Sequence, residues 1–150
     1  MVSSDRYSVE TARHRLVLYG ETTPFWEDVE RALDAARGCV WVSTFIYHDD
    51  SLGRDFGERL VSAAARGVDV RLLYDSVGSS EADPSFFEQL AARGVRVKCY
   101  RPWRLLRFWR YFPRDHGRIL LIDELAFTGG VNWRNDWWPA ARGGGDWHDV

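Results

Sequence analysis

Lysine, cysteine and long apolar runs are almost absent from this 150-residue chain. Lys98 is the only lysine among the 20 basic residues, so arginine supplies nearly all of the positive charge. Cys39 and Cys99 are too few for a disulfide framework, and we expect free thiols in a reducing compartment. Apolar runs of only a few residues exclude a transmembrane helix, and the polar residues 1–15 lack the apolar core of a signal peptide. A cytoplasmic protein is therefore expected.

The composition is that of an ordinary globular protein. Hydrophobic residues make up 45% of the chain and charged residues 28%, with a net charge of −2, which excludes an intrinsically disordered chain. A chain of 150 residues can bury a sizeable core in one domain. Because no repeat, low-complexity tract or linker divides the sequence, we expect residues 1–150 to form a single domain.

Strand and helix periodicities alternate along the chain. Thr22 or Thr23 can cap the first helix, and Asp83 can cap the third, with Pro84 at its first position. The expected strands are 15–19, 40–47, 68–74 and 95–100, the expected helices are about 22–37, 55–66 and 84–93, and a hairpin is expected from 119–122 and 126–128. This alternation predicts an α/β fold with a mixed, mainly parallel sheet flanked by helices.

A histidine and an arginine stand two residues apart near the carboxyl end of the chain. In an extended strand, His116 and Arg118 point to the same face and can meet one ligand together. A nucleophilic imidazole beside a fixed cation suits a substrate that is both electrophilic and anionic, which describes a phosphate ester. His14 and His48 lack such neighbours and are expected at the surface.

This region resembles the phospholipase D superfamily, whose signature is HxKxxxxD followed by a Gly-Gly/Ser-x-Asn element. The residues that match in spacing are His116, Asp123, Gly129, Gly130 and Asn132. Arg118 stands where that family has lysine. The similarity covers about residues 14–150, includes the stretch 75–79, and is greatest to the amino-terminal half of bacterial cardiolipin synthases. It implies the phospholipase D-like α/β fold.

The resemblance also implies a catalytic role for each motif residue. His116 would attack phosphorus and form a phosphohistidine, Arg118 would bind the phosphate, and Asp123 would orient the histidines. The residues that would bind the substrate are Asn132, Gly129 and Gly130. The resemblance implies no metal and no other cofactor. Because this chemistry needs two motifs and the chain holds one, a homodimer or a second motif-bearing half would have to complete the site.

Arginines alternate with aromatic and aliphatic residues directly before the motif. The residues expected to form a membrane or substrate surface are Trp103, Arg104, Arg107, Phe108, Trp109 and Arg110. Such a mixture suits an anionic membrane interface, where rings lie at headgroup depth and guanidinium groups meet phosphates. It also suits single-stranded nucleic acid, with bases stacked on the rings, or burial under the remainder of a larger enzyme.

Three functions are compatible with these features. The first is phosphatidyl transfer or phosphodiester hydrolysis on anionic phospholipid, in a protein peripheral to the cytoplasmic membrane. The second is a homodimeric single-motif phosphodiesterase or nuclease. The third is a catalytically impaired lipid-binding remnant, because the guanidinium of Arg118 binds phosphate bidentately but cannot lose its proton. The sequence therefore leaves open whether the chain is an active enzyme.

Overall fold

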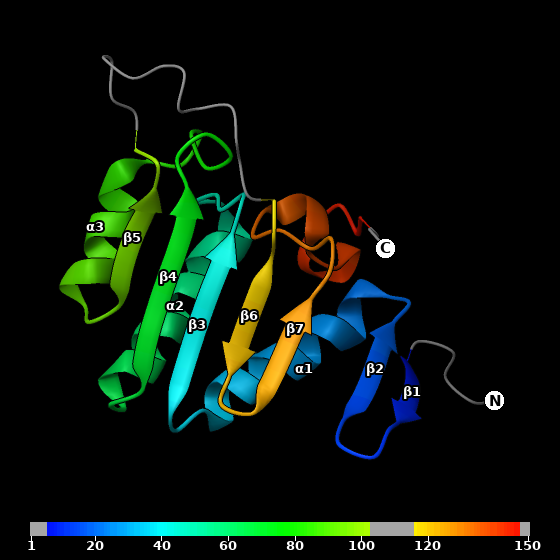
Figure 1. Ribbon diagram of the computed structural model, residues 1–150. Helices are drawn as coiled ribbons and strands as arrows, with labels where there is room; N and C mark the ends of the chain where they lie inside the picture. Colours follow the sequence, from blue (N-terminus) through cyan, green and yellow to red (C-terminus); the bar gives the residue numbers. More distant parts are fainter. Residues whose placement is uncertain (1–5, 103–115, 148–150) are drawn as a thin grey trace.

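The computed structural model describes residues 6–102 and 116–147 (Figure 1). The strands are β1 (Arg6–Glu10), β2 (Arg15–Tyr19), β3 (Cys39–Thr44), β4 (Asp69–Asp75), β5 (Arg96–Tyr100), β6 (Ile119–Ile122) and β7 (Leu125–Thr128). The helices are α1 (Thr22–Ala35), α2 (Ser51–Ala65) and α3 (Pro84–Ala92), and 3₁₀ turns follow at Asn135–Trp137 and Ala140–Arg142.

Five strands form one mixed sheet, in the order β5, β4, β3, β6, β7 (Figure 1). β3, β4 and β5 are parallel, whereas β6 is antiparallel to both of its neighbours, β3 and β7. Within this sheet, β6 therefore runs against the other strands. Ser43 pairs with Ile119, so β6 begins beside the carboxyl end of β3. The predicted α/β fold with a mixed sheet is confirmed, and the pairings of the described sheet are two parallel and two antiparallel.

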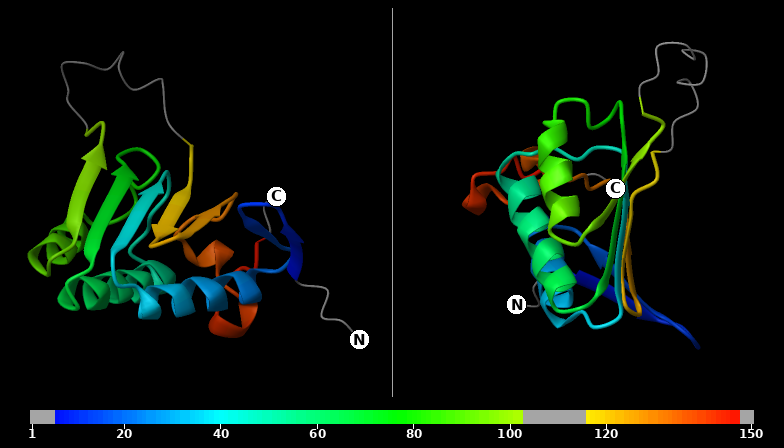
Figure 2. Two further views of the ribbon diagram at one scale, coloured as in Figure 1. Left: turned by 60° about the horizontal axis from the view of Figure 1, so that its bottom comes forward. Right: turned by 90° about the vertical axis from the view of Figure 1, so that its left-hand side faces the viewer.

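The helices α1, α2 and α3 lie on one face of the sheet (Figure 2). Because side chains alternate between the two faces of a strand, every second strand residue points into the core beneath these helices. Core residues that are at most 2% exposed include Trp26, Val29, Leu60, Val40, Val70, Leu72, Leu120 and Ile122. None of the helices in the described segments is long and apolar enough to cross a membrane.

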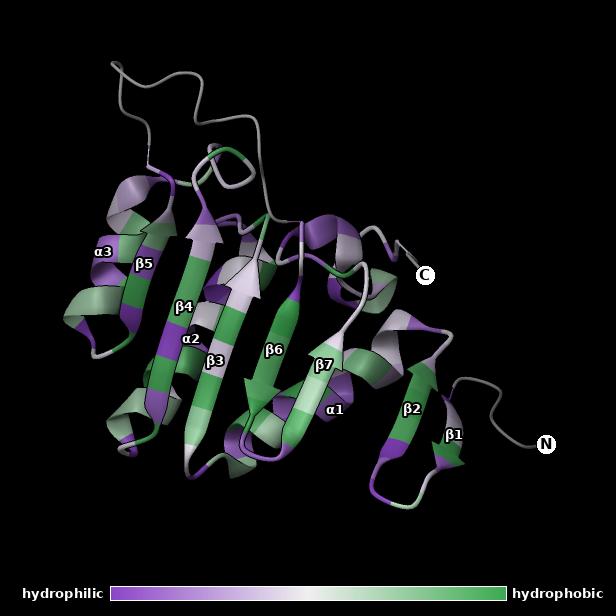
Figure 3. Cartoon of the chain, in the orientation of Figure 1, coloured by the Kyte–Doolittle hydropathy of each residue, from purple (hydrophilic) through white to green (hydrophobic). Residues whose placement is uncertain are grey.

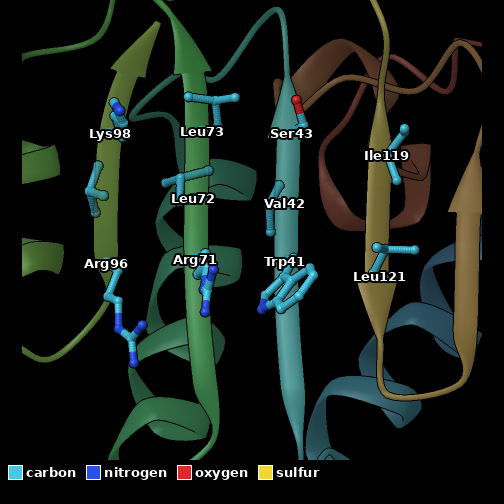
Figure 4. A pocket seen from close by; sticks show the side chains of 11 residues that line it. Trp41, Val42, Ser43, Arg71, Leu72, Leu73, Arg96, Lys98, Ile119 and Leu121 are labelled. Atoms are coloured by element: carbon cyan, nitrogen blue, oxygen red, sulfur yellow. The ribbon is translucent and has the colours of Figure 1, made fainter.

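The opposite face of the sheet carries no helix from the described residues (Figure 2). Much of the length of strands β3 and β6 is coloured as hydrophobic in Figure 3. Apolar and basic side chains on this face line a pocket that spans β5, β4, β3 and β6 (Figure 4). Trp41 is 40% exposed there and Ile119 is 46% exposed. The guanidinium of Arg71 lies 4.7 Å from the ring centroid of Trp41 and donates a hydrogen bond of 2.7 Å to Asp69.

The chain bends where β3 was expected to continue. β3 ends at Thr44, and the bend begins at Phe45. Tyr47 then makes a single parallel bridge with Trp133 instead of extending the strand. The predicted strand end is therefore too late, and the bend places Phe45 at the end of the sheet where β6 begins.

Helix starts follow the capping side chains that are present. As predicted, Asp83 caps α3 by accepting a hydrogen bond of 2.8 Å from the backbone N–H of Ser85. α2 begins earlier than predicted, because Asp50 accepts a hydrogen bond of 3.0 Å from the backbone N–H of Gly53. The predicted threonine cap of α1 is wrong, since Thr22 is the first residue of the helix itself.

The strand β1 was not predicted. It pairs with β2 in a separate antiparallel hairpin, and Tyr7 and Val9 remain 58% and 62% exposed. On the side that faces the helix α1, Tyr19 donates a hydrogen bond of 2.8 Å to Asp28. Partial burial, together with this bond to Asp28, raises the pKa of Tyr19 to about 12. A strand with little burial gives a weak sequence signal, which explains why β1 was missed.

Candidate active site

Arg118 and Asn132 are hydrogen-bonded to each other at one end of the sheet. Arg118 precedes β6 and Asn132 follows β7, so the β6–β7 hairpin brings together residues that are 14 positions apart. The Nε of Arg118 donates to Oδ1 of Asn132 at 2.7 Å. Asn132 is fully buried, and its Nδ2 donates to the carbonyl of Gly130 at 3.3 Å. Among the described residues, no carboxylate forms an ion pair with Arg118.

The glycine pair of the motif makes the turn that leads to Asn132. Gly129 has φ +152, a conformation that residues with a side chain rarely adopt. A Cβ at Gly129 would meet no atom within 4 Å, so glycine is needed there for its backbone conformation rather than for space. Gly130 is buried and supplies the carbonyl that accepts from Asn132. The open space at Gly129 also lets a ligand approach the backbone.

His116 lies two residues before Arg118, at the same end of the sheet. Its imidazole is exposed and lies against the ring of Phe45, with centroids 4.2 Å apart and planes inclined by 56°. Phe45 follows β3, whose last residues pair with the start of β6. The structure thus brings His116, Arg118 and Asn132 to one end of the sheet. An exposed imidazole, a guanidinium and an amide can together bind and attack a phosphate ester.

The structure does not bring Asp123 to His116. Asp123 follows β6 and His116 precedes it, so the length of that strand separates them. The Asp123 carboxylate accepts hydrogen bonds from the backbone N–H groups of Arg37 (3.0 Å), Gly38 (2.8 Å) and Cys39 (2.9 Å). These bonds, that of Arg37 first, hold the pKa of Asp123 below its ordinary value. The position of Asp123 does not support its expected role in orienting His116. Its carboxylate instead stabilises the chain at the start of β3.

Replacing Asp123 with asparagine should destabilise the fold in a pH-dependent way. Because its pKa is lowered on folding, the carboxylate adds stability above the ordinary aspartate pKa of about 3.9, and this stability is lost as the pH falls through the lower folded-state pKa. At pH 7 the variant should therefore have a smaller free energy of unfolding than the wild type, and the deficit should shrink toward pH 3. Urea unfolding at both pH values measures this, with Glu124→Gln as a neighbouring control. Equal stability at pH 7 would refute the structural role of Asp123.

His48 was predicted to lie at the surface, and that prediction is wrong. Its exposed fraction is only 9%, and its backbone N–H donates to the carbonyl of Trp133 at 2.9 Å. Its Nδ1 lies 3.7 Å from Oε2 of Glu81. His48 therefore anchors the segment after β3 to the residue that follows Asn132.

Three further features were compared with the position of His116, Arg118 and Asn132: the predicted membrane surface, the pocket on the uncovered face of the sheet, and groups that could hold a metal. The predicted membrane or substrate surface, Trp103, Arg104, Arg107, Phe108, Trp109 and Arg110, lies outside the described residues. The pocket on the uncovered sheet face includes none of His116, Arg118 and Asn132 (Figure 4). Among the described residues, no group of three or more histidine, cysteine or acidic side chains is placed to hold a metal ion.

Comparison with known proteins identifies the family. A family model described as the phospholipase D-like domain of cardiolipin synthase matches residues 29–141. Cardiolipin synthase A from Pseudomonas entomophila is 36% identical over 140 residues, which are 91% of this chain and 28% of that protein. Cardiolipin synthase A from Pseudomonas fluorescens is 37% identical over 121 residues, 79% of this chain and 25% of that protein. The chain therefore belongs to the phospholipase D-like domain family of cardiolipin synthases, and it spans about a quarter of the length of these relatives.

A solved structure shares the same fold. NucT from Helicobacter pylori superposes with a TM-score of 0.56 over 77% of this chain and 70% of that chain. The two sequences are only 16% identical in the aligned region, so the likeness concerns the fold alone. It agrees with the phospholipase D-like architecture expected from the motif.

Proposed function

We propose that this chain supplies one half of a phospholipase D-type active site that transfers or hydrolyses the phosphodiester of anionic phospholipids. The observation that carries the proposal is the hydrogen-bonded pair of Arg118 and Asn132, at the end of the sheet where the exposed imidazole of His116 lies. Membership of the cardiolipin synthase family supports the choice of phospholipid over other phosphodiesters.

In the proposed reaction, a ring nitrogen of His116 attacks the phosphorus atom. The P–N bond forms as the P–O bond to the leaving alcohol breaks, which leaves the phosphatidyl group on the histidine. The leaving oxygen takes a proton from the histidine of a second motif, and that histidine later removes a proton from the acceptor. The acceptor oxygen then displaces His116. An alcohol as acceptor completes phosphatidyl transfer, and water completes hydrolysis.

Arg118 and Asn132 bind the phosphate in this reaction. The guanidinium neutralises the phosphate oxygens as charge builds up on them, and it remains protonated throughout. The hydrogen bond from Nε to Asn132 fixes the plane of the guanidinium, and burial of Asn132 holds that acceptor in place. Arg118 therefore orients the phosphorus toward His116 without taking part in proton transfer.

A second motif has to complete the site. In a symmetric homodimer, two copies of His116 would face each other across the two-fold axis, one as nucleophile and one as acid and base. A separate motif-bearing polypeptide would serve equally. The exposure of His116 supports either arrangement, since a second histidine can reach the same phosphate.

Residues 103–110 are proposed to hold the protein at the surface of an anionic membrane, peripheral to the cytoplasmic leaflet. Changing both Trp103 and Trp109 to alanine should weaken sedimentation with phosphatidylglycerol vesicles. Each nearby arginine contributes on the order of 1 kcal/mol of attraction that salt screens, whereas inserted tryptophan adds apolar burial that salt does not screen. Binding of the wild type should therefore fall with added salt but persist, while binding of the double variant should vanish at high salt.

Trp147→Ala provides the matched control for this experiment, because Trp147 is 56% exposed and lies outside the segment. Its vesicle binding should equal that of the wild type. Equal partition of the wild type into phosphatidylcholine and phosphatidylglycerol vesicles would overturn the membrane proposal. Tight binding of single-stranded DNA without vesicle binding would favour the nuclease alternative instead.

A further inference from the structure

The loop after β4 is held by hydrogen bonds to the last residue of that strand. The Asp75 carboxylate is buried and accepts hydrogen bonds from the backbone N–H groups of Val77 (2.8 Å) and Gly78 (3.1 Å). The backbone N–H of Ser79 donates to the carbonyl of Asp75 at 3.0 Å. Residues 75–79 therefore form a hydrogen-bonded turn at the end of the sheet where β3 also ends (Figure 1).

This turn is hydrogen-bonded to the segment that follows β3. The Ser79 hydroxyl accepts from the backbone N–H of Tyr47 at 3.0 Å and donates to the carbonyl of Phe45 at 3.2 Å. Ser79 is only 3% exposed, and its bond to the backbone N–H of Tyr47 is buried. The backbone of Gly78 packs so closely that a Cβ there would lie 2.3 Å from the carbonyl oxygen of Phe45. The backbone of Phe45 is thus held by the Ser79 hydroxyl and by the close approach of Gly78, both from the loop after β4.

We infer that Ser79 is a positioning residue, which acts through Phe45 to hold the imidazole of His116 in the orientation needed for attack on phosphorus. The chain of contacts runs from the Ser79 hydroxyl to the Phe45 backbone, and from the Phe45 ring to the His116 ring 4.2 Å away. The Phe45 ring lies against this exposed imidazole with the two planes inclined by 56°, so a shift of Phe45 changes the surroundings that orient His116. The inference rests on the proposed role of His116 as nucleophile.

The contact can be measured without any substrate. The imidazole proton resonances of His116, assigned by their loss in His116→Ala, should carry a ring-current shift from Phe45. Phe45→Leu removes the ring and defines the resonance positions without contact. Ser79→Ala should move the His116 resonances toward those positions, and Gly78→Ala should do the same by displacing the Phe45 carbonyl. Ser80→Ala changes the exposed neighbouring serine and should leave the resonances unchanged.

The kinetic consequence is tested in an assembly that completes the two-motif site. Ser79→Ala and Phe45→Leu should each lower kcat for phosphatidyl transfer by up to about tenfold with little change in KM, because a misoriented nucleophile slows the chemical step rather than substrate binding. His116 resonances that do not move in either Ser79→Ala or Gly78→Ala would overturn the positioning role. Because the resonances are read without lipid, a protein that shows the shifts but no lipid turnover would contradict the proposed function and leave the contact itself established.

Discussion

Replacing His116 with alanine should abolish phosphatidyl transfer in any assembly that completes the two-motif site. The nucleophile cannot be supplied by a neighbour, because Arg118 stays protonated and Asn132 is buried. The loss should be on the order of 10³-fold or more, as expected when the group that forms the covalent intermediate is removed. A transfer assay with labelled phosphatidylglycerol measures it.

His14→Ala is the matched control for this experiment. His14 is exposed like His116, but it lies in the β1–β2 hairpin. The control variant should transfer phosphatidyl groups at the rate of the wild type. Substantial activity in His116→Ala would mean that another residue is the nucleophile.

The second large effect is expected at Arg118. Arg118→Ala should lower turnover by about 10²–10³-fold, because the variant lacks the donor that we propose binds the reacting phosphate. Arg118→Lys should keep the charge and restore the lysine of the family signature. Because 19 of the 20 basic residues in this chain are arginine, we attribute Arg118 to this bias in composition and expect turnover of Arg118→Lys to rise above that of the wild type.

The two variants Arg118→Ala and Arg118→Lys also test whether the chain is a catalytically impaired remnant. A rise in turnover in Arg118→Lys would show a site that is weakened but otherwise complete. Equal binding of phosphatidylglycerol vesicles by all three proteins, with turnover in none of them, would favour the non-catalytic lipid-binding alternative. Lower turnover in Arg118→Lys than in the wild type would show instead that the bidentate guanidinium is required.

The motif part of the site could be predicted from the sequence because its geometry is local. Residues two positions apart in an extended segment point to the same face, and a tight hairpin with a glycine turn returns the chain to the same end of the sheet. These local features are enough to bring Arg118 to Asn132, and the structure shows the hydrogen bond between the two side chains. Asp123 has the same motif spacing, but the antiparallel run of β6 carries it to the far end of the sheet. Spacing in a signature therefore does not mean proximity in space.

The contacts that hold the site in place could not be read from local patterns. The Ser79 hydroxyl donates a hydrogen bond to the carbonyl of Phe45, which is 34 positions earlier in the sequence. The backbone N–H of His48 donates to the carbonyl of Trp133. Such contacts depend on where two strands end relative to each other, which hydrophobic periodicity does not encode. The sheet order was needed to see that the loops after β3 and β4 meet beside His116.

In the proposed reaction, His116 carries the phosphatidyl group during turnover. Intact-protein and peptide mass spectrometry, after incubation with phosphatidylglycerol and a quench without acid, reads this intermediate directly. The account predicts a phosphatidyl adduct on the peptide that contains His116, and no adduct in His116→Ala. An adduct on His14, His48 or His148, or steady turnover with no adduct at His116, would contradict it.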